Sequence, residues 1–157
     1  MAKEVERKFL VTDASWRDAV ETSIAIIQFY LAISAERSIR VRISNGENAK
    51  LTLKFGSDLQ QRDEFEYPVP LADAREMLAF AIGTVISKTR HHVRHKNYLY
   101  EVDVFNGELD GLVVAELETT DKVGEDLLPP WLDQEVTGEL RYSNASLALN
   151  GFPERAQ

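Results

Sequence analysis

Charged and apolar side chains alternate with a period of two through much of the chain, and this pattern restricts the fold to one rich in strands. In segment 37–44, Arg40 and Arg42 fall on one side of the chain. The intervening Val41 falls on the other side, because successive side chains of a strand point to opposite faces. The same alternation predicts eight strands at residues 2–11, 25–33, 37–44, 49–55, 61–69, 85–93, 98–105 and 112–119.

Short helices and turns are predicted between these strands. Asp13 is the expected N-cap of a short amphipathic helix, and further helices are expected at 71–82 and 143–149. Asn45-Gly46 is typical of a tight turn between two antiparallel strands. The 157 residues contain no repeat or linker, so we expect one domain, 1–157, of the α+β class and mainly β.

The charges on the polar faces are segregated by sign from strand to strand. One interpretation is an antiparallel sheet with one face in water. The segregation of charge by sign favours a second interpretation, in which the charged face is enclosed. On an exposed face segregated pairs would gain little, because exposed ion pairs contribute only ~0–1 kcal/mol. An eight-stranded antiparallel barrel would instead enclose opposed fields in its lumen. The carboxylates on these faces are Glu4, Glu6, Glu64, Glu66, Glu101, Asp103, Glu116 and Glu118, and the cations are Lys8, Arg40, Arg42, Lys50, Lys54, Arg62, Lys88, Arg90 and Arg94.

Opposed acidic and basic walls indicate a ligand that carries both a metal ion and phosphate. Arginine forks and lysine ammonium groups match the anionic oxygens of a triphosphate. Carboxylates do not bind phosphate, but they hold Mg²⁺ or Mn²⁺, which prefers oxygen ligands and bridges carboxylate to phosphate. The pattern therefore predicts a site for a metal–triphosphate complex.

Composition excludes several other classes of protein. The formal net charge of −8 disfavours nucleic acid and anionic lipid as partners. No apolar run approaches the ~18 residues of a membrane helix. A membrane porin is disfavoured because the first ten residues lack the apolar region of a signal peptide and helices are expected between strands. The absence of cysteine suits a cytoplasmic protein.

Several short motifs resemble those of one known family in order and approximate spacing. The first is the acidic–basic run Glu4-Val5-Glu6-Arg7-Lys8. With it go Gln28–Leu31, Arg40-Val41-Arg42, Leu53-Lys54, Glu64–Tyr67, Lys88-Thr89-Arg90, Glu101-Val102-Asp103, Glu116-Leu117-Glu118 and Tyr142-Ser143-Asn144. Over nearly its whole length the chain resembles the CYTH superfamily, the triphosphate tunnel metalloenzymes, and in particular the short bacterial inorganic triphosphatases.

The resemblance implies an eight-stranded tunnel in which inorganic triphosphate is hydrolysed to diphosphate and phosphate with Mg²⁺ or Mn²⁺. It implies phosphate-binding roles for Lys8, Arg40, Arg42, Lys54, Lys88 and Arg90. It implies metal ligation by Glu4, Glu6, Glu116 and Glu118, with Glu64 and Asp103 as further candidates. The catalytic set expected from it is Glu4, Glu6, Lys8, Lys88, Glu116 and Glu118.

Other functions remain alternatives within and outside this family. A class IV adenylate cyclase, or another nucleoside or thiamine triphosphatase, would use the same walls on a different triphosphate. A non-catalytic module that binds polyphosphate or nucleotide is a third interpretation, although anion binding alone would be stronger without the carboxylates. We expect a small-molecule triphosphate as substrate and leave open whether the protein forms a homodimer.

Overall fold

In the computed structural model, which describes residues 5–57 and 62–153, the strands form one antiparallel sheet. Its strand order is β5-β4-β3-β2-β6-β7-β8-β1-β9. The strands are β1 (Val5–Val11), β2 (Val20–Ile33), β3 (Arg37–Ser44), β4 (Asn48–Phe55), β5 (Asp63–Val69), β6 (Ile82–His95), β7 (Tyr98–Phe105), β8 (Val113–Thr119) and β9 (Leu132–Glu135). The mainly β, antiparallel class predicted from the sequence is therefore confirmed.

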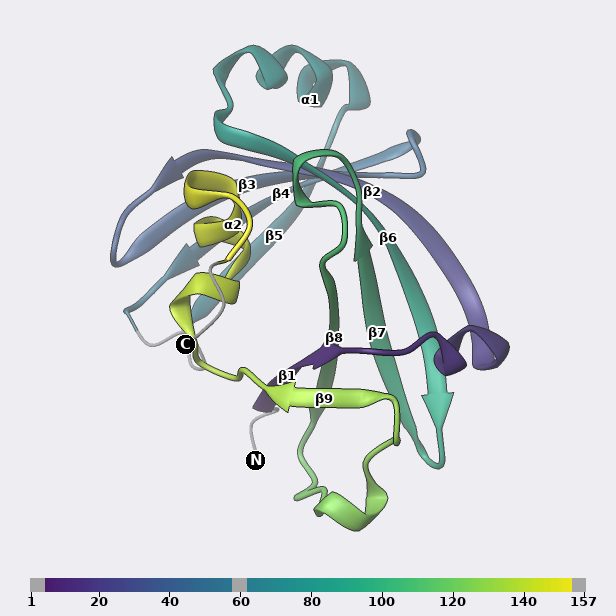
Figure 1. The fold of residues 1–157 in the computed structure, drawn as a ribbon. Coiled ribbons are helices and arrows are strands. Elements are labelled where there is room, and N and C mark those ends of the chain that lie inside the picture. Colours follow the sequence, from purple (N-terminus) through teal and green to yellow (C-terminus); the bar gives the residue numbers. More distant parts are fainter. Residues whose placement is uncertain (1–4, 58–61, 154–157) are drawn as a thin grey trace.

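The sheet differs from the predicted barrel in two respects. It has nine strands instead of eight, and its edge strands β5 and β9 do not pair with each other within residues 5–57 and 62–153. The ninth strand is only four residues long and follows Pro129-Pro130, so it is too short to show alternation. The sheet nevertheless curls strongly, as Figure 1 shows, and encloses a pocket between its two ends.

Local sequence explains most of the strand limits. β3 and β7 have the predicted limits, and the Asn45-Gly46 turn joins β3 to β4. Both turn residues have positive φ, 53° and 65°, which is the backbone of the hairpin turn that this dipeptide favours. β2 and β6 are each 14 residues long and extend well beyond their predicted starts.

The helix predicted at 71–82 is shorter than expected, the one predicted at 143–149 is shifted by one residue, and the one expected after Asp13 is a 3₁₀ turn. α1 spans Leu71–Met77 and continues into a 3₁₀ turn at Leu78–Phe80 before β6 begins. α2 spans Asn144–Asn150, with Ser143 as its N-cap and Gly151 after it. The helix expected after Asp13 is a 3₁₀ turn at Ser15–Ala19. The N-cap position of that turn is Ala14, and the Asp13 carboxylate accepts hydrogen bonds from Ser15 instead. Further 3₁₀ turns lie at Gly107–Leu109, Glu125–Leu127 and Leu140–Tyr142.

Two apolar clusters cover the outer face of the curled sheet. α1 packs Ala74 onto Phe29, Val41 and Ile43 of β2 and β3, and it lies outside the sheet in Figure 1. The second cluster packs Trp16 and Trp131 onto β6, β7 and β8. These clusters contain the apolar positions of the alternating strands, and their burial leaves the charged positions on the inner face.

A third apolar cluster lies on the inner face and was not expected from the sequence. Tyr30, Ile86, Phe105 and Val114 point to the same side of the sheet as the charged residues and pack against α2 and the turn before it. Gly83 permits this packing, because a Cβ there would overlap the carbonyl group of Ala148 in α2. One end of the lumen is thus filled by α2.

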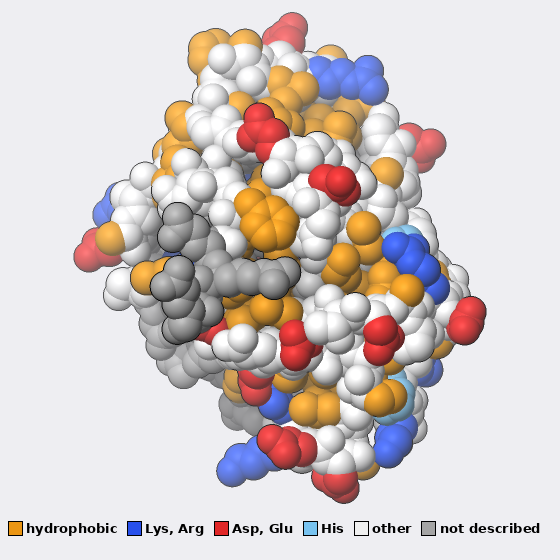
Figure 2. Space-filling view, in the orientation of Figure 1, with side chains coloured by type: hydrophobic (Ala, Val, Ile, Leu, Met, Phe, Trp, Pro, Cys, Tyr) orange, Lys and Arg blue, Asp and Glu red, His pale blue; other side chains and the backbone are white. Residues whose placement is uncertain are grey.

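The outer surface differs in charge from the lumen. On the face in Figure 2, acidic side chains are scattered among apolar and neutral ones and do not form one patch. Six of the 18 lysine and arginine residues line the internal pocket instead. The pocket lining also contains seven glutamates, so the lumen holds concentrated charge of both signs that the net charge of −8 does not reveal. No helix in the described parts of the chain is long and apolar enough to cross a membrane.

Candidate active site

The inner faces of three neighbouring strands change from apolar to charged along their length. β6 presents Ile86 and then Arg90, and β8 presents Val114 and then Glu116. β7 runs antiparallel to both, so its Phe105 lies at the apolar end and Glu101 at the charged end. The strand register therefore separates a packed, dry end of the lumen from a charged end.

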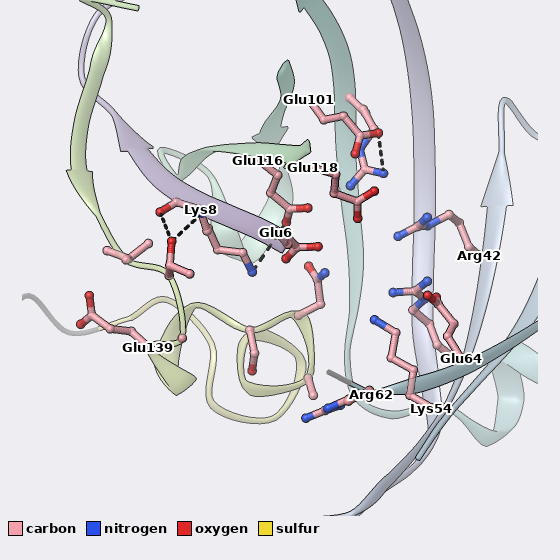
Figure 3. Close-up of a pocket in the computed structure, with 18 of the residues that line it drawn as sticks. Glu6, Lys8, Arg42, Lys54, Arg62, Glu64, Glu101, Glu116, Glu118 and Glu139 are labelled. Carbon is pink, nitrogen blue, oxygen red and sulfur yellow. Dashed lines mark hydrogen bonds and ion pairs between the residues drawn. The ribbon is translucent and has the colours of Figure 1, made fainter. Parts of the chain in front are cut away.

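The charged end contains a pocket of about 210 Å³. Figure 3 shows Glu6 and Glu116 on one side of it and Arg42 and Lys54 across from them. The lining residues come from seven strands, from the position just before β5, from the segment before α2 and from the start of α2: Glu6, Lys8, Arg40, Arg42, Lys54, Arg62, Glu64, Glu66, Arg90, Glu101, Glu116, Glu118, Val136, Thr137, Gly138, Glu139, Ser143, Asn144 and Ala145.

The acidic wall, formed by Glu6, Glu116 and Glu118, results from the pairing of β1 with β8. Glu6 lies directly opposite Glu118 in the register, and Lys8 lies opposite Glu116. Carboxylates directly opposite each other repel and destabilise a sheet. Burial raises the pKa of Glu6 to about 7, with a further contribution from Glu116. The fourth predicted member, Glu4, lies outside the described residues.

Lys8 joins the acidic wall to the C-terminal segment. Its ammonium group lies 3.6 Å from Glu116 and donates a hydrogen bond to the carbonyl oxygen of Tyr142 at 3.1 Å. Its backbone N–H also donates to the hydroxyl of Thr137. Lys8 therefore keeps part of its charge available to the pocket while it holds the segment 136–145 in place.

The basic wall, formed by Arg40, Arg42, Lys54 and Arg62, lies on β3, on β4 and just before β5. Within the described chain, none of these four cations has a carboxylate within ion-pair distance. Burial, together with neighbouring Arg40 and Arg90, lowers the pKa of Arg42 to about 10. Burial and Arg40 also lower the pKa of Lys54. Concentrated positive charge of this kind, without close ion-pair partners in the described chain, favours an anionic ligand.

Lys88, Arg90 and Asp103 form a buried ion network beside the basic wall. The Asp103 carboxylate accepts from Lys88 Nζ at 2.7 Å and from Arg90 Nε and Nη2 at 2.8 and 3.0 Å. Arg90 Nη1 also lies 3.2 Å from Glu101. Both cations hold the pKa of Asp103 well below its usual range, although its burial acts in the opposite direction.

This network changes the roles expected for its members. Both oxygens of Asp103 are engaged by Lys88 and Arg90, so metal ligation by Asp103 stays a prediction and a second role, holding these two cations, stands beside it. Lys88 is almost fully buried, and its Nζ donates a hydrogen bond of 3.5 Å to Oδ1 of Asn144, which lines the pocket. Glu64, the other additional metal candidate, lies opposite Lys54 in the β4–β5 register and so belongs to the basic side.

The structure adds residues to the site that the sequence did not assign. The segment before α2 contributes Thr137 and Glu139, for which the sequence offered no alternation or motif. Arg62, Glu66 and Glu101 do line the pocket. Their strand faces indicated a place in the lumen, but nothing in the pattern separated them from solvated charges.

The donor set fits a hard divalent cation. The acidic wall offers carboxylate oxygens without cysteine or histidine, which is the ligand chemistry that Mg²⁺ and Mn²⁺ prefer. A cation bound between Glu6 and Glu118 would also relieve the electrostatic repulsion between these two opposed carboxylates. Among the described residues, which do not include Glu4, no three acidic or histidine side chains are already gathered around one point.

The raised pKa of Glu6 predicts a pH dependence of stability in the metal-free protein. The folded carboxyl has a pKa of about 7 against 4.5 in the unfolded chain, so the folded state binds the extra proton between these values. The stability of wild type relative to Glu6→Gln should therefore fall as pH rises from 4.5 to 7. Urea unfolding in EDTA measures it. Wild type and Glu6→Gln both contain His91 and His95, so the titration of these histidines cancels in the difference between the two free energies of unfolding. If that difference stays constant or rises with pH, the prediction is contradicted.

A curled antiparallel sheet that encloses opposed acidic and basic walls defines a class of protein built to hold a compact polyanion. The comparisons with known proteins agree with this class. The chain belongs to the CYTH domain family, whose model matches residues 2–152.

Two relatives match the chain over almost its full length. An inorganic triphosphatase of Acetivibrio thermocellus is 35% identical over 153 residues, 97% of each chain. An inorganic triphosphatase of Nitrosomonas europaea is 33% identical over 151 residues, 94% of this chain and 97% of the relative.

Solved structures share the fold. The crystal structure of an inorganic triphosphatase superposes with a TM-score of 0.68 at 29% identity, and the match covers 95% of this chain and 96% of that one. A putative adenylyl cyclase from Hippeastrum with a dominant triphosphatase activity has a TM-score of 0.58 at 14% identity, over 75% and 80% of the two chains. At that identity the likeness shows the fold alone.

Proposed function

We propose that this protein hydrolyses inorganic triphosphate to diphosphate and phosphate with the help of Mg²⁺ or Mn²⁺. The observation that carries the proposal is the presence of both walls in one pocket of about 210 Å³. A polyanion alone would bind the basic wall but be weakened by repulsion from the acidic wall, and a cation alone would meet the reverse. A triphosphate with its cation satisfies both. The relatives named as inorganic triphosphatases support the same activity.

The basic wall binds the phosphate chain. Arg40 and Arg42 offer planar forks to the anionic oxygens, and Lys54 offers a point charge from the next strand. Lys8 reaches the pocket from the acidic side and binds the end of the substrate closest to Glu116. These cations are held by the sheet before the substrate arrives, so little reorganisation is needed on binding.

The acidic wall holds the metal. Glu6, Glu116 and Glu118 are its proposed ligands, and Glu4, which lies outside the described residues, stays a ligand predicted from the sequence. A bound Mg²⁺ or Mn²⁺ would neutralise phosphate oxygens and activate water for attack. In the reaction, a water oxygen forms a bond to the terminal phosphorus as the bridging P–O bond breaks. The electron pair leaves with diphosphate and a proton is released.

The ion network of Lys88, Arg90 and Asp103 supports the basic wall beside the substrate. Asp103 fixes Lys88 and two nitrogens of Arg90, and the remaining Arg90 nitrogen meets Glu101 at the pocket surface. We therefore assign Asp103 to holding these cations. The phosphate-binding roles of Lys88 and Arg90 stay predictions, as do the cytoplasmic location and a homodimer.

The lining favours an inorganic substrate over a nucleotide. None of the described residues around the pocket is aromatic, and its apolar members are limited to Val136 and Ala145. Such a surface offers a purine or thiazole ring no face on which to stack. Interactions in this site are therefore made with phosphate groups and metal.

We expect tripolyphosphate to exceed ATP and thiamine triphosphate in kcat/KM by roughly tenfold or more, because a base or thiazole gains no binding energy here. Phosphate release measured side by side at matched Mg²⁺ or Mn²⁺ tests this. Formation of cyclic AMP and diphosphate from ATP would indicate a cyclase. Tight binding of tripolyphosphate without turnover would indicate a binding module.

A further inference from the structure

Gln28 of β2 is buried on the inner face of the sheet, directly behind the basic wall. Its exposed fraction is 0%, and it lies opposite Arg42 in the β2–β3 register. A buried amide needs hydrogen-bond partners, because leaving one of its groups unsatisfied costs stability. The partners of Gln28 therefore indicate what it does in the site.

The oxygen of Gln28 holds the guanidinium of Arg42. Gln28 Oε1 accepts from Arg42 Nε at 3.1 Å and from Arg42 Nη2 at 3.0 Å. Within the described chain, the third nitrogen of Arg42, Nη1, has no hydrogen-bond partner. In Figure 3 the Arg42 side chain extends from its strand into the pocket. The amide thus fixes the plane of the guanidinium and leaves one edge for a ligand.

Arg90 shows the alternative way of holding an arginine in the same pocket. Two oxygens of Asp103 and one of Glu101 hold its guanidinium, and these carboxylates offset its positive charge. Gln28 gives Arg42 a comparable two-nitrogen contact from a neutral oxygen. Arg42 is oriented without losing its charge, whereas a carboxylate at the same point would compete with phosphate for it.

Gln28 carries out this task at a cost to stability. Its Nε2 donor is buried and has no hydrogen-bond partner among residues 5–57 and 62–153. The neighbouring groups, including Arg42 and Lys88 on adjacent strands, are themselves donors. Packing alone would be served better by an apolar side chain, and pairing alone by glutamate.

We propose that Gln28 is a positioning residue that presents Arg42 to the triphosphate in a fixed orientation with its full charge. The inference rests on the proposed function, because it takes triphosphate as the ligand. It assigns to a neutral side chain outside the pocket lining a role in determining affinity for the polyanion.

The first test compares two nearly isosteric changes, Gln28→Glu and Gln28→Met. Gln28→Glu keeps an oxygen acceptor for Arg42, but its carboxylate offsets the positive charge that Arg42 offers to the ligand. It should raise the Kd for tripolyphosphate roughly tenfold or more, because a charge-assisted bond to the ligand is weakened, while thermal stability stays equal or rises. Gln28→Met should also raise the Kd, because Arg42 loses its orientation. Calorimetric titration in EDTA measures Kd without turnover. Gln134→Glu, the same chemical change on exposed β9, is the matched control and should leave Kd unchanged.

The second test is a double-mutant cycle with Arg42→Ala. If Gln28 acts through Arg42, the effect of Gln28→Met on Kd should shrink to less than about twofold in the Arg42→Ala background. An effect of the same size in both backgrounds overturns the inference, as does wild-type affinity in Gln28→Glu. This cycle does not use Gln28→Glu, so it decides the matter even where that variant fails to fold.

The proposed function fails separately from the inference. Absence of phosphate release by wild-type protein that binds tripolyphosphate would reject the hydrolase. The ratios of Kd in the two tests would still show whether Gln28 presents Arg42 to the anion.

Discussion

Replacing Asp103 by asparagine should lower the free energy of unfolding by roughly 3–5 kcal/mol, the range found when one partner of a buried ion pair is removed. The change leaves the buried Lys88 ammonium and two nitrogens of Arg90 without their counter-ion. Urea or guanidinium unfolding at neutral pH measures it. A loss of this size is a large fraction of the stability of an ordinary domain.

Glu101→Gln is the matched control for this prediction. It removes the other carboxylate partner of Arg90, but the Glu101 side chain is 30% exposed, so water replaces much of what is lost. Its effect should stay within about 1 kcal/mol. Lys88→Met in the Asp103→Asn background should recover part of the stability, because it removes one uncompensated charge. Wild-type stability of Asp103→Asn, together with weakened metal binding, would instead place Asp103 among the metal ligands.

Glu116→Gln should lower kcat by roughly 100-fold or more, because charge stabilisation by a bound metal contributes several kcal/mol to catalysis. Glu116 occupies the middle of the acidic wall, opposite Lys8 in the register and beside Glu6. Steady-state kinetics with tripolyphosphate measures the change, and EDTA should abolish wild-type turnover.

Glu21→Gln provides the control for the loss of a carboxylate elsewhere. Glu21 pairs with Arg94 on the exposed surface, at 2.9 Å and with both side chains nearly half exposed. Its kcat should remain within about twofold of wild type, since an exposed ion pair contributes little. Full activity of Glu116→Gln, or of wild type in EDTA, would remove the metal from the proposal.

The sequence predicted what depends on alternation within one strand. Arg40 and Arg42 share the inner face with Glu6 and Glu116 because side-chain direction repeats every two residues. The Asn45-Gly46 turn has the backbone conformation that its residues favour. These features are local, so a single sequence carries them.

What depends on contacts between distant segments was not predicted. Asp103 and Glu101 share one face of β7, yet the first is buried between Lys88 and Arg90 and the second lines the pocket. Only the position of β7 relative to α2 and the apolar end of the lumen separates them. Gln28 likewise has an ordinary place in an alternating strand, and its role depends on the register that brings it opposite Arg42.

The pairing of β1 has a consequence for the order in which the protein assembles. β1 is synthesised first of the described strands, but its pairing partners are β8 and β9. The hydrogen bond from Lys8 N to Thr137 Oγ1 joins residues 129 positions apart. At the ribosome, β1 therefore emerges long before the strands that hold it, and contacts of such separation form slowly. The acidic wall needs both β1 and β8, so a chain that has not yet been synthesised as far as β8 lacks the assembled wall.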